Sequence, residues 1–328
     1  MKRIIQISVM ILLVFGLTVS AEATSNSYYP VPKSGKTPAG IYQKGKAVVL
    51  SKNKNETLPI RDVVTIKSSI FYSEIAKSTP LNQCNKSLSE YNLKLKSGKS
   101  VKTLEDKISS LSSPLTTDGT FLYYPAVTGQ YTNDFIRLNT DGKSRKVLVK
   151  DVDDAWYAAG SLFYVKDGAI HVLNPKTLQS SVWDASTGLA YSGGPCSENT
   201  YTLSPNGIMM HRYTFNNHQP THKTLFMYDY KKKTTHTLNP VRIKEEEFTL
   251  MYDFDVIKKQ YVNMEFDAKG PKLVVRDFNH KKVKDIHRVY AFTDLEKSHT
   301  MSKFFEELNL AKRSITYVSG KQLTVKKF

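Results

Sequence analysis

A short pattern recurs along this 328-residue chain: an apolar or aromatic triplet, a turn, a second apolar pair, an Asn or Asp, and then a basic hairpin. The clearest copy opens at Phe121-Leu122-Tyr123-Tyr124 and runs on through Phe135 to Lys143. Self-similarity at a fixed period constrains a fold more strongly than local propensity, because each copy must be one repeated structural unit. The opening triplets end at positions 72, 124, 164, 210, 264 and 317.

The spacing of these triplets, about 40 to 54 residues, covers the period of four-stranded propeller blades. Each copy has the pattern of a strand, a tight turn and a second strand. Lys166-Asp167-Gly168-Ala169 predicts a hairpin, since Asp-Gly supplies the positive φ that a type I′ turn needs. We therefore predict an all-β fold, a β-propeller of six or seven blades over residues 40–328. A β-sandwich or two stacked β domains is the alternative, because short strands with Gly and Asp turns fit those folds too.

The copy that starts at Asp118-Gly119 and ends at Asp141-Gly142-Lys143 is the one most similar to a known blade. It resembles the blades of bacterial propeller domains of unknown function related to the low-density-lipoprotein-receptor propeller. The copy from Ser204 to Tyr230 instead resembles a TolB-like blade. The resemblance covers most of residues 40–328 and implies a propeller fold and a non-enzymatic binding habit. It implies no catalytic residues.

The first 39 residues divide into two parts. Lys2 and Arg3, the apolar run from Val9 to Val19, and Ala21-Glu22-Ala23 predict a secretory signal peptide over residues 1–23. Residues 24–39 are interpreted as an extended leader without its own core. No later segment is apolar enough to span a bilayer. Together with the signal peptide, this predicts that the mature chain is secreted or otherwise extracytoplasmic and associated with the cell envelope. We also expect it to be a monomer.

One segment near the C-terminus departs from the strand pattern. In residues 298–312, Met301, Phe304, Phe305 and Leu308 recur at spacings of three and four, and Ser298 can cap. That spacing predicts a short helical insertion.

The chain is strongly basic, with a formal net charge of +17. Many lysines occupy predicted hairpins, as in Lys231-Lys232-Lys233 and Lys281-Lys282. Lysines there also keep β edges soluble, but the total exceeds the net charge of about 2 to 8 that solubility asks of a small domain. We therefore expect contact with an anionic polymer of the envelope or an acidic polysaccharide. Nucleic acid is not expected as a partner, since neither a recognition helix nor a zinc module is present.

Several residue groups are candidate sites. Cys84 and Cys196, the only cysteines, are a candidate disulfide in an exported chain, with two free thiols as the alternative. His211, His218 and His222 form the only histidine cluster, interpreted as a surface loop rather than a metal site because Pro220 interrupts it. Asp151 to Asp154 lacks the Gly and Glu of a calcium loop and is interpreted as the end of one blade and the start of the next.

No nucleophile elbow, Walker loop or dinucleotide fingerprint is found, so no catalytic residue, cofactor or metal is predicted. Trp156, Tyr157 and Trp183 are candidate aromatics of a ligand face, because Tyr and Trp beside Lys suit carbohydrate or peptide contacts. Packing between blades is the alternative role for these three rings.

The sequence thus supports three functional hypotheses. The first is an exported non-enzymatic binding protein that uses a propeller face to hold a protein or an anionic envelope polymer. The second is a secreted propeller glycosidase or polysaccharide lyase, with carboxylates brought together from different strands. The third is a structural spacer. Two acids and an aromatic meeting in the central funnel would favour the enzyme.

Overall fold

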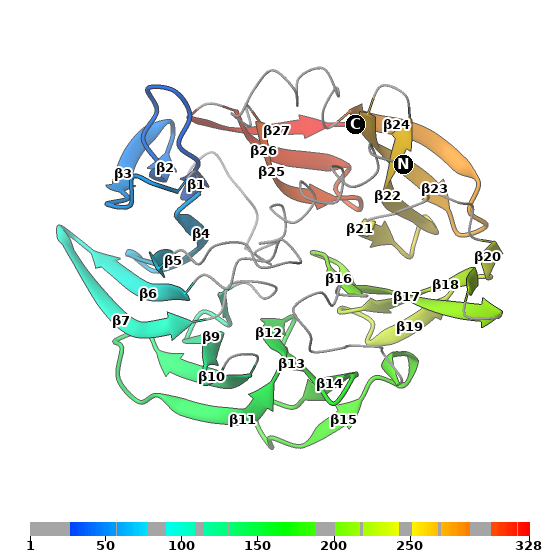
Figure 1. Ribbon diagram of the computed structural model, residues 1–328, viewed down its shortest axis with the longest axis horizontal. Helices are drawn as coiled ribbons and strands as arrows, with labels where there is room; N and C mark the ends of the chain where they lie inside the picture. The colour runs from blue at the N-terminus through cyan, green and yellow to red at the C-terminus, as the bar shows by residue number, and fades with distance from the viewer. Residues whose placement is uncertain are drawn as a thin grey trace.

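The described part of the chain folds mainly into antiparallel β-sheets that follow one another around a ring (Figure 1). The computed structural model describes residues 27–56, 58–77, 90–108, 115–129, 132–187, 201–216, 219–242, 251–267, 270–288, 303–319 and 321–328. The predicted signal peptide, Cys84, Cys196 and His218 lie outside these residues. Within them the only helical element is the short 3-10 helix η2 (Asp184–Ser186), and no helix is long and apolar enough to cross a membrane.

Five blades of four consecutive strands make up most of the ring. The first two blades, joined by a single pairing of Ile108 with Ala126, are β4 (Ile60–Ile66), β5 (Ser69–Lys77), β6 (Glu90–Ser97) and β7 (Ser100–Ile108), then β8 (Thr116–Thr117), β9 (Phe121–Val127), β10 (Asn133–Asn139) and β11 (Lys146–Val152). The third blade is β12 (Asp154–Ala158), β13 (Ser161–Lys166), β14 (Ala169–Leu173) and β15 (Ser180–Val182). The fourth and fifth are β16 (Tyr201–Leu203), β17 (Gly207–Asn216), β18 (Gln219–Asp229) and β19 (Thr234–Thr237), with β20 (Val241–Arg242) beside β18, then β21 (Met251–Asp255), β22 (Gln260–Asp267), β23 (Gly270–Asp277) and β24 (Lys282–Arg288).

Two smaller sheets, of three strands each, come from the two ends of the chain. They are β1 (Tyr29–Val31), β2 (Gly40–Gln43) and β3 (Lys46–Leu50), and β25 (Lys303–Asn309), β26 (Ser314–Ser319) and β27 (Gln322–Lys327). The all-β, propeller-like arrangement is confirmed, but the predicted six or seven blades are not: within the described residues, five blades have four strands. The repeat overestimates the number of blades because its triplets mark the second strand of a sheet. The three-stranded sheet β25–β27 also has such a strand.

The repeat itself corresponds to fixed positions in the sheets. Each of the six opening triplets falls on the second strand of its sheet, namely β5, β9, β13, β17, β22 and β26. These strands are buried because they have a neighbour on both sides and pack between sheets; Phe71, Leu122 and Ile208, for example, are fully buried. The predicted Asp-Gly hairpin is also confirmed: Lys166 pairs with Ala169, and Asp167 and Gly168 have φ values of 52° and 69°.

The predicted helix over residues 298–312 is wrong for its described part, where Lys303–Asn309 is strand β25. A β-bulge between Phe305 and Glu307 explains the misleading spacing. Position 305 pairs with Tyr317 and position 308 with Ile315, which are two residues apart and therefore lie on one face of β26. The extra residue thus places positions three apart on one face of a strand, a spacing that normally indicates a helix.

The ring closes where the first sheet meets the last. Tyr29, inside the predicted leader, lies on β1, and its hydroxyl donates to the Lys321 carbonyl oxygen (2.9 Å) while accepting from the Gly45 N–H (2.9 Å). Tyr29, Tyr42 and Val318 pack in one buried cluster. Residues 292 positions apart therefore hold the two ends of the chain together.

We expect Tyr29→Phe to lower the free energy of unfolding by about 1–3 kcal/mol, because it leaves two main-chain groups without their partner. Urea unfolding followed by circular dichroism measures this. Tyr42→Phe is the matched control, since the Tyr42 hydroxyl bonds only locally, to the Pro38 carbonyl oxygen. An effect of Tyr29→Phe no larger than that of the control would contradict the closing role of this bond.

Candidate functional site: a face of basic turns

The three aromatic residues singled out in the sequence lie in the packing between blades. The Trp156 ring is fully buried, stacks on Phe163 and Tyr201 with centroids 5.5 and 5.9 Å apart, and donates from Nε1 to the Tyr230 hydroxyl (3.0 Å). Trp183 is buried as well, and its Nε1 donates to Thr235 Oγ1. Only Tyr157, stacked on Tyr123, is half-exposed.

The histidine cluster and the Asp151 to Asp154 run lie on strands or between them. His211 and His222 lie on the paired strands β17 and β18, not in a loop as predicted, because that hairpin extends beyond Pro220. Burial lowers the pKa of His211 to about 3, with further lowering from the neighbouring Lys223 and His280. As predicted, the Asp151 to Asp154 run ends one blade and begins the next.

Three basic turns of the ring have a common geometry. Asp229–Lys233, Asp255–Lys259 and Asn309–Arg313 each link two paired strands through a four-residue loop. In each, the first side chain accepts main-chain N–H groups of its own turn: Asp229 from Lys231 and Lys232, Asp255 from Ile257 and Lys258, and Asn309 from Lys312. This is the local chemistry that makes Asp and Asn favourable at turns.

The last residue of each of these turns is basic and has a left-handed backbone. The φ values are 54° at Lys233, 51° at Lys259 and 51° at Arg313. Such a conformation costs a non-glycine residue roughly 1–2 kcal/mol, and glycine adopts it freely. The chain therefore carries a basic side chain at positions where the backbone favours glycine.

Turns of neighbouring sheets lie side by side. Asp253 is buried on β21, just before the Asp255–Lys259 turn, and its Oδ2 accepts from Asn206 Nδ2 (2.8 Å) and from the Leu310 N–H (2.6 Å). Asn206 belongs to the turn before β17 and Leu310 to the Asn309–Arg313 turn. One carboxyl group thus connects the first turns of three successive sheets and places them at one end of the ring.

In an antiparallel sheet the first and third turns lie at the same end. Together these turns form what we call the basic face, which carries exposed basic residues from each of the five blades and from the last sheet. Its acidic residues bond their own turns; Asp141 accepts the Lys143 N–H, and Asp277 accepts those of Asn279 and Lys281. The exposed basic residues of this face are Lys67, Lys99, Lys143, Lys176, Lys231, Lys232, Lys233, Lys258, Lys259, Lys281, Lys312 and Arg313.

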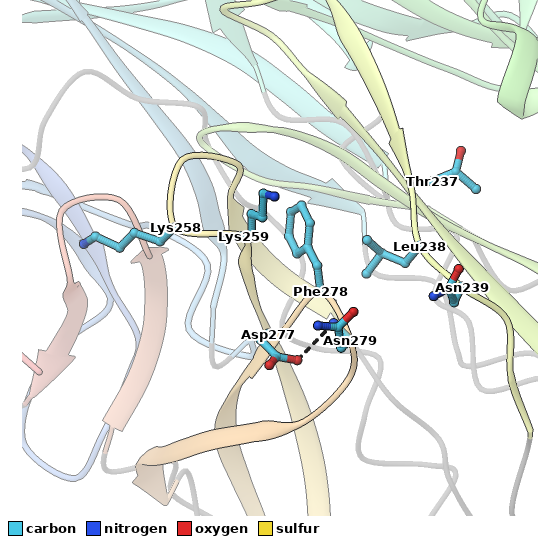
Figure 2. A pocket seen from close by; sticks show the side chains of 8 residues that line it. All are labelled: Thr237, Leu238, Asn239, Lys258, Lys259, Asp277, Phe278 and Asn279. Atoms are coloured by element: carbon cyan, nitrogen blue, oxygen red, sulfur yellow. Dashed lines mark hydrogen bonds between the residues drawn. The ribbon is translucent and has the colours of Figure 1, made fainter.

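A pocket of about 480 Å³ opens between the fourth and fifth blades (Figure 2). Lys258 and Lys259 come from the turn before β22, and Asp277, Phe278 and Asn279 from the turn before β24; the segment Thr237–Asn239 forms the other side. Figure 2 shows Lys259 beside the Phe278 ring, whereas Lys258 points away from it. His280 connects the two sides, since its Nε2 lies 2.8 Å from the Asn239 carbonyl oxygen.

The sequence analysis does not predict three buried carboxyl groups, which lie on β4, β12 and β21, the first strands of three blades. Asp62, Asp154 and Asp253 are at most 2% exposed, and burial raises their pKa values to about 6, 7 and 7. Each is hydrogen-bonded within the packing: Asp62 by Ser73, Asp154 by the Tyr201 hydroxyl of the next blade, and Asp253 across three sheets. Their bonding is that of structural links between strands and blades.

Comparison with known proteins identifies no family. No family model matches the chain, and no curated protein matches it. A computationally designed protein, Ika8, is 10% identical with a TM-score of 0.47, covering 94% of this chain and 82% of that one. The N-terminal domain of Nup159 is 10% identical with a TM-score of 0.46 (94% and 89% covered), and TolB from Acinetobacter baumannii is 11% identical with a TM-score of 0.36 (91% and 78% covered). At TM-scores below 0.5 these likenesses establish neither family nor function, and the relation to low-density-lipoprotein-receptor-type propellers stays a prediction.

Proposed function

We propose that this protein is an exported, non-enzymatic binding protein that holds an anionic polymer of the cell envelope on its basic face. The observation that carries the proposal is the repeated basic turn, with Lys233, Lys259 and Arg313 at left-handed positions. Backbone strain that persists at equivalent places is typical of functional positions. The net charge of +17 and the predicted signal peptide agree with an anionic partner outside the cytoplasm.

A binding role is favoured over the two other hypotheses. The buried carboxyl groups of the first strands bond to Ser73, Tyr201, Asn206 and Leu310, which supports packing rather than hydrolysis as their role. A spacer would gain nothing from basic residues gathered on one face of the ring.

The test is co-sedimentation of the chain from residue 24 onward with purified cell envelope, at low and at high salt. We expect binding at low salt and its loss at high salt, because exposed charges are screened within about 10 Å at 0.1 M salt. We expect the double variant Lys233→Gly/Lys259→Gly to weaken binding at least about tenfold, from roughly 1 kcal/mol for each cation removed near an anionic surface.

The control double variant is Lys44→Gly/Lys107→Gly. These lysines also have left-handed backbones, with φ values of 50° and 58°, so the substitution is the same in charge and in conformation. Lys44 lies in the β2–β3 turn beside Gln322, and Lys107 near the end of β7, both away from the basic face. If both double variants weaken envelope binding equally, the effect depends only on the total charge of the protein, which would contradict the proposal.

Stability separates a binding defect from a folding defect. Because glycine adopts the left-handed conformation without strain, we expect both double variants to keep or raise Tm. Loss of envelope binding by the Lys233→Gly/Lys259→Gly variant therefore reports on contact with the polymer.

A further inference from the structure

The pocket between the fourth and fifth blades differs from the rest of the basic face because it combines two lysines, one of them beside an aromatic ring, with apolar, neutral polar and acidic groups. Phe278 is half-buried, and Leu238 beside it is buried. The His236 ring packs against Phe278, with centroids 6.4 Å apart and planes tilted by 51°, and so helps to fix the Phe278 ring. The volume of about 480 Å³ lies in the range of small-molecule sites.

The polar side chains of the pocket can form hydrogen bonds with the hydroxyl groups of a ligand. Thr237, Asn239 and Asn279 are exposed and supply a hydroxyl and two amides, which both donate and accept. The Asp277 carboxylate adds acceptor atoms only. Lys259, drawn beside the Phe278 ring, is the cation nearest to that ring among the pocket residues in Figure 2.

From this combination we propose that the pocket binds a single acidic sugar ring, a pyranose that carries a carboxylate. The Phe278 ring would contact the apolar C–H face of the sugar, the amides and Asp277 its hydroxyls, and Lys259 its carboxylate. The inference rests on the proposed function, and it specifies an acidic polysaccharide as the polymer.

A phosphate group fits this pocket less well. Phosphate sites use several converging N–H groups or cations. Here the N–H groups of Asn279 and Lys281 already donate to Asp277 Oδ1, both at 2.9 Å, and the Asp277 charge repels a dianion. The composition of the pocket therefore favours a carboxylated sugar over the dianion of a phosphate monoester.

The experiment is calorimetric titration of the protein at 0.15 M salt with three probes: trigalacturonic acid, the neutral galactose trisaccharide, and pyrophosphate. We expect measurable binding of trigalacturonic acid, much weaker binding of the neutral trisaccharide, and little or none of pyrophosphate. Phe278→Leu keeps apolar volume but removes the flat ring, and should weaken trigalacturonic acid binding about fivefold to tenfold. Asn279→Ala, at an exposed position that tolerates substitution, should weaken it as well.

Tight binding of pyrophosphate, or trigalacturonic acid affinities in both variants equal to that of the unmodified protein, would overturn the acidic-sugar assignment. Envelope co-sedimentation, run in parallel, distinguishes the two proposals. Envelope binding that depends on Lys233 and Lys259 but not on Phe278 would leave the proposed function standing and sink the pocket assignment. Binding of trigalacturonic acid without any envelope binding would sink the envelope function instead.

Discussion

Trp156→Ala is expected to lower the free energy of unfolding by about 3–5 kcal/mol, the range measured when large buried aromatic side chains are truncated. The ring is fully buried, and its two stacking partners lie in different blades, Phe163 in the third and Tyr201 in the fourth. Its removal leaves a cavity between the blades and deprives the buried Tyr230 hydroxyl of its donor. Loss of this ring therefore weakens the packing of one blade on the next.

Urea unfolding followed by far-ultraviolet circular dichroism is the suitable measurement, because the chain has only two tryptophans and fluorescence would change with the substitution itself. Trp156→Phe is the graded control, since it keeps most of the stacked surface and loses the N–H donor. Val182→Ala, on the outermost strand of the same blade and 41% exposed, should have little effect. A loss below 1 kcal/mol for Trp156→Ala would show that the blades do not depend on this contact.

The second large effect is on the pH dependence of stability, and Asp253 is its clearest source. Burial raises the folded-state pKa of Asp253 to about 7, against 3.8 for an ordinary Asp. Between these pH values the folded protein keeps a proton that the unfolded chain has lost, so folding takes up a proton. The stability from this group is complete below pH 3.8 and is lost as the pH rises toward about 7, by up to about 1.4 kcal/mol per pH unit.

Asp253→Asn removes that proton exchange and keeps the shape of the side chain. We expect the free energy of unfolding of this variant to fall less steeply between pH 5 and pH 8 than that of the unmodified protein. The stability of the variant relative to the unmodified protein is therefore expected to be higher at pH 8 than at pH 5. Asp141→Asn, at an exposed turn, is the control for the change in charge. Parallel pH profiles for Asp253→Asn and the unmodified protein would contradict a titrating carboxyl at this position. Asp62 and Asp154 should add slopes of the same sign, since burial raises both of their pKa values.

Much of the fold could be predicted because inner strands and tight turns are specified by residues close together in the sequence. The apolar triplets identified the second strand of every sheet except the first, and Asp167-Gly168 identified a type I′ turn. The blade count failed because the triplets carry no information on how many outer strands a sheet has. The helix prediction failed at β25 because a bulge shifts the alternation by one residue, and the pairing with β26 decides where that bulge lies.

The candidate site was predictable only in its parts. The basic hairpins at Lys231-Lys232-Lys233 and Lys281-Lys282 were visible in the sequence, but the Asn309–Arg313 turn was not, because residues 298–312 were predicted as a helix. The sequence left Trp156 and Trp183 as candidates for a ligand face, with packing between blades as the alternative role. Their burial depends on Tyr201, Tyr228 and Tyr230 from the next blade. The three buried carboxyl groups had no local signature, since an Asp at the start of a strand looks the same whether a neighbouring sheet covers it or not.

The sequence by itself determined the second strands of the sheets and the chemistry of the turns, because an apolar triplet and an Asp or Asn that accepts its own turn's N–H groups act within a few positions. Only the tertiary structure decided which turns adjoin and which charges they gather on one face. Asp253 joins Asn206 and Leu310, 47 and 57 positions away, and Tyr29 reaches Lys321 across 292 positions. Such contacts form only when the sheets close into a ring, since the separation along the chain says nothing about which sheets become neighbours.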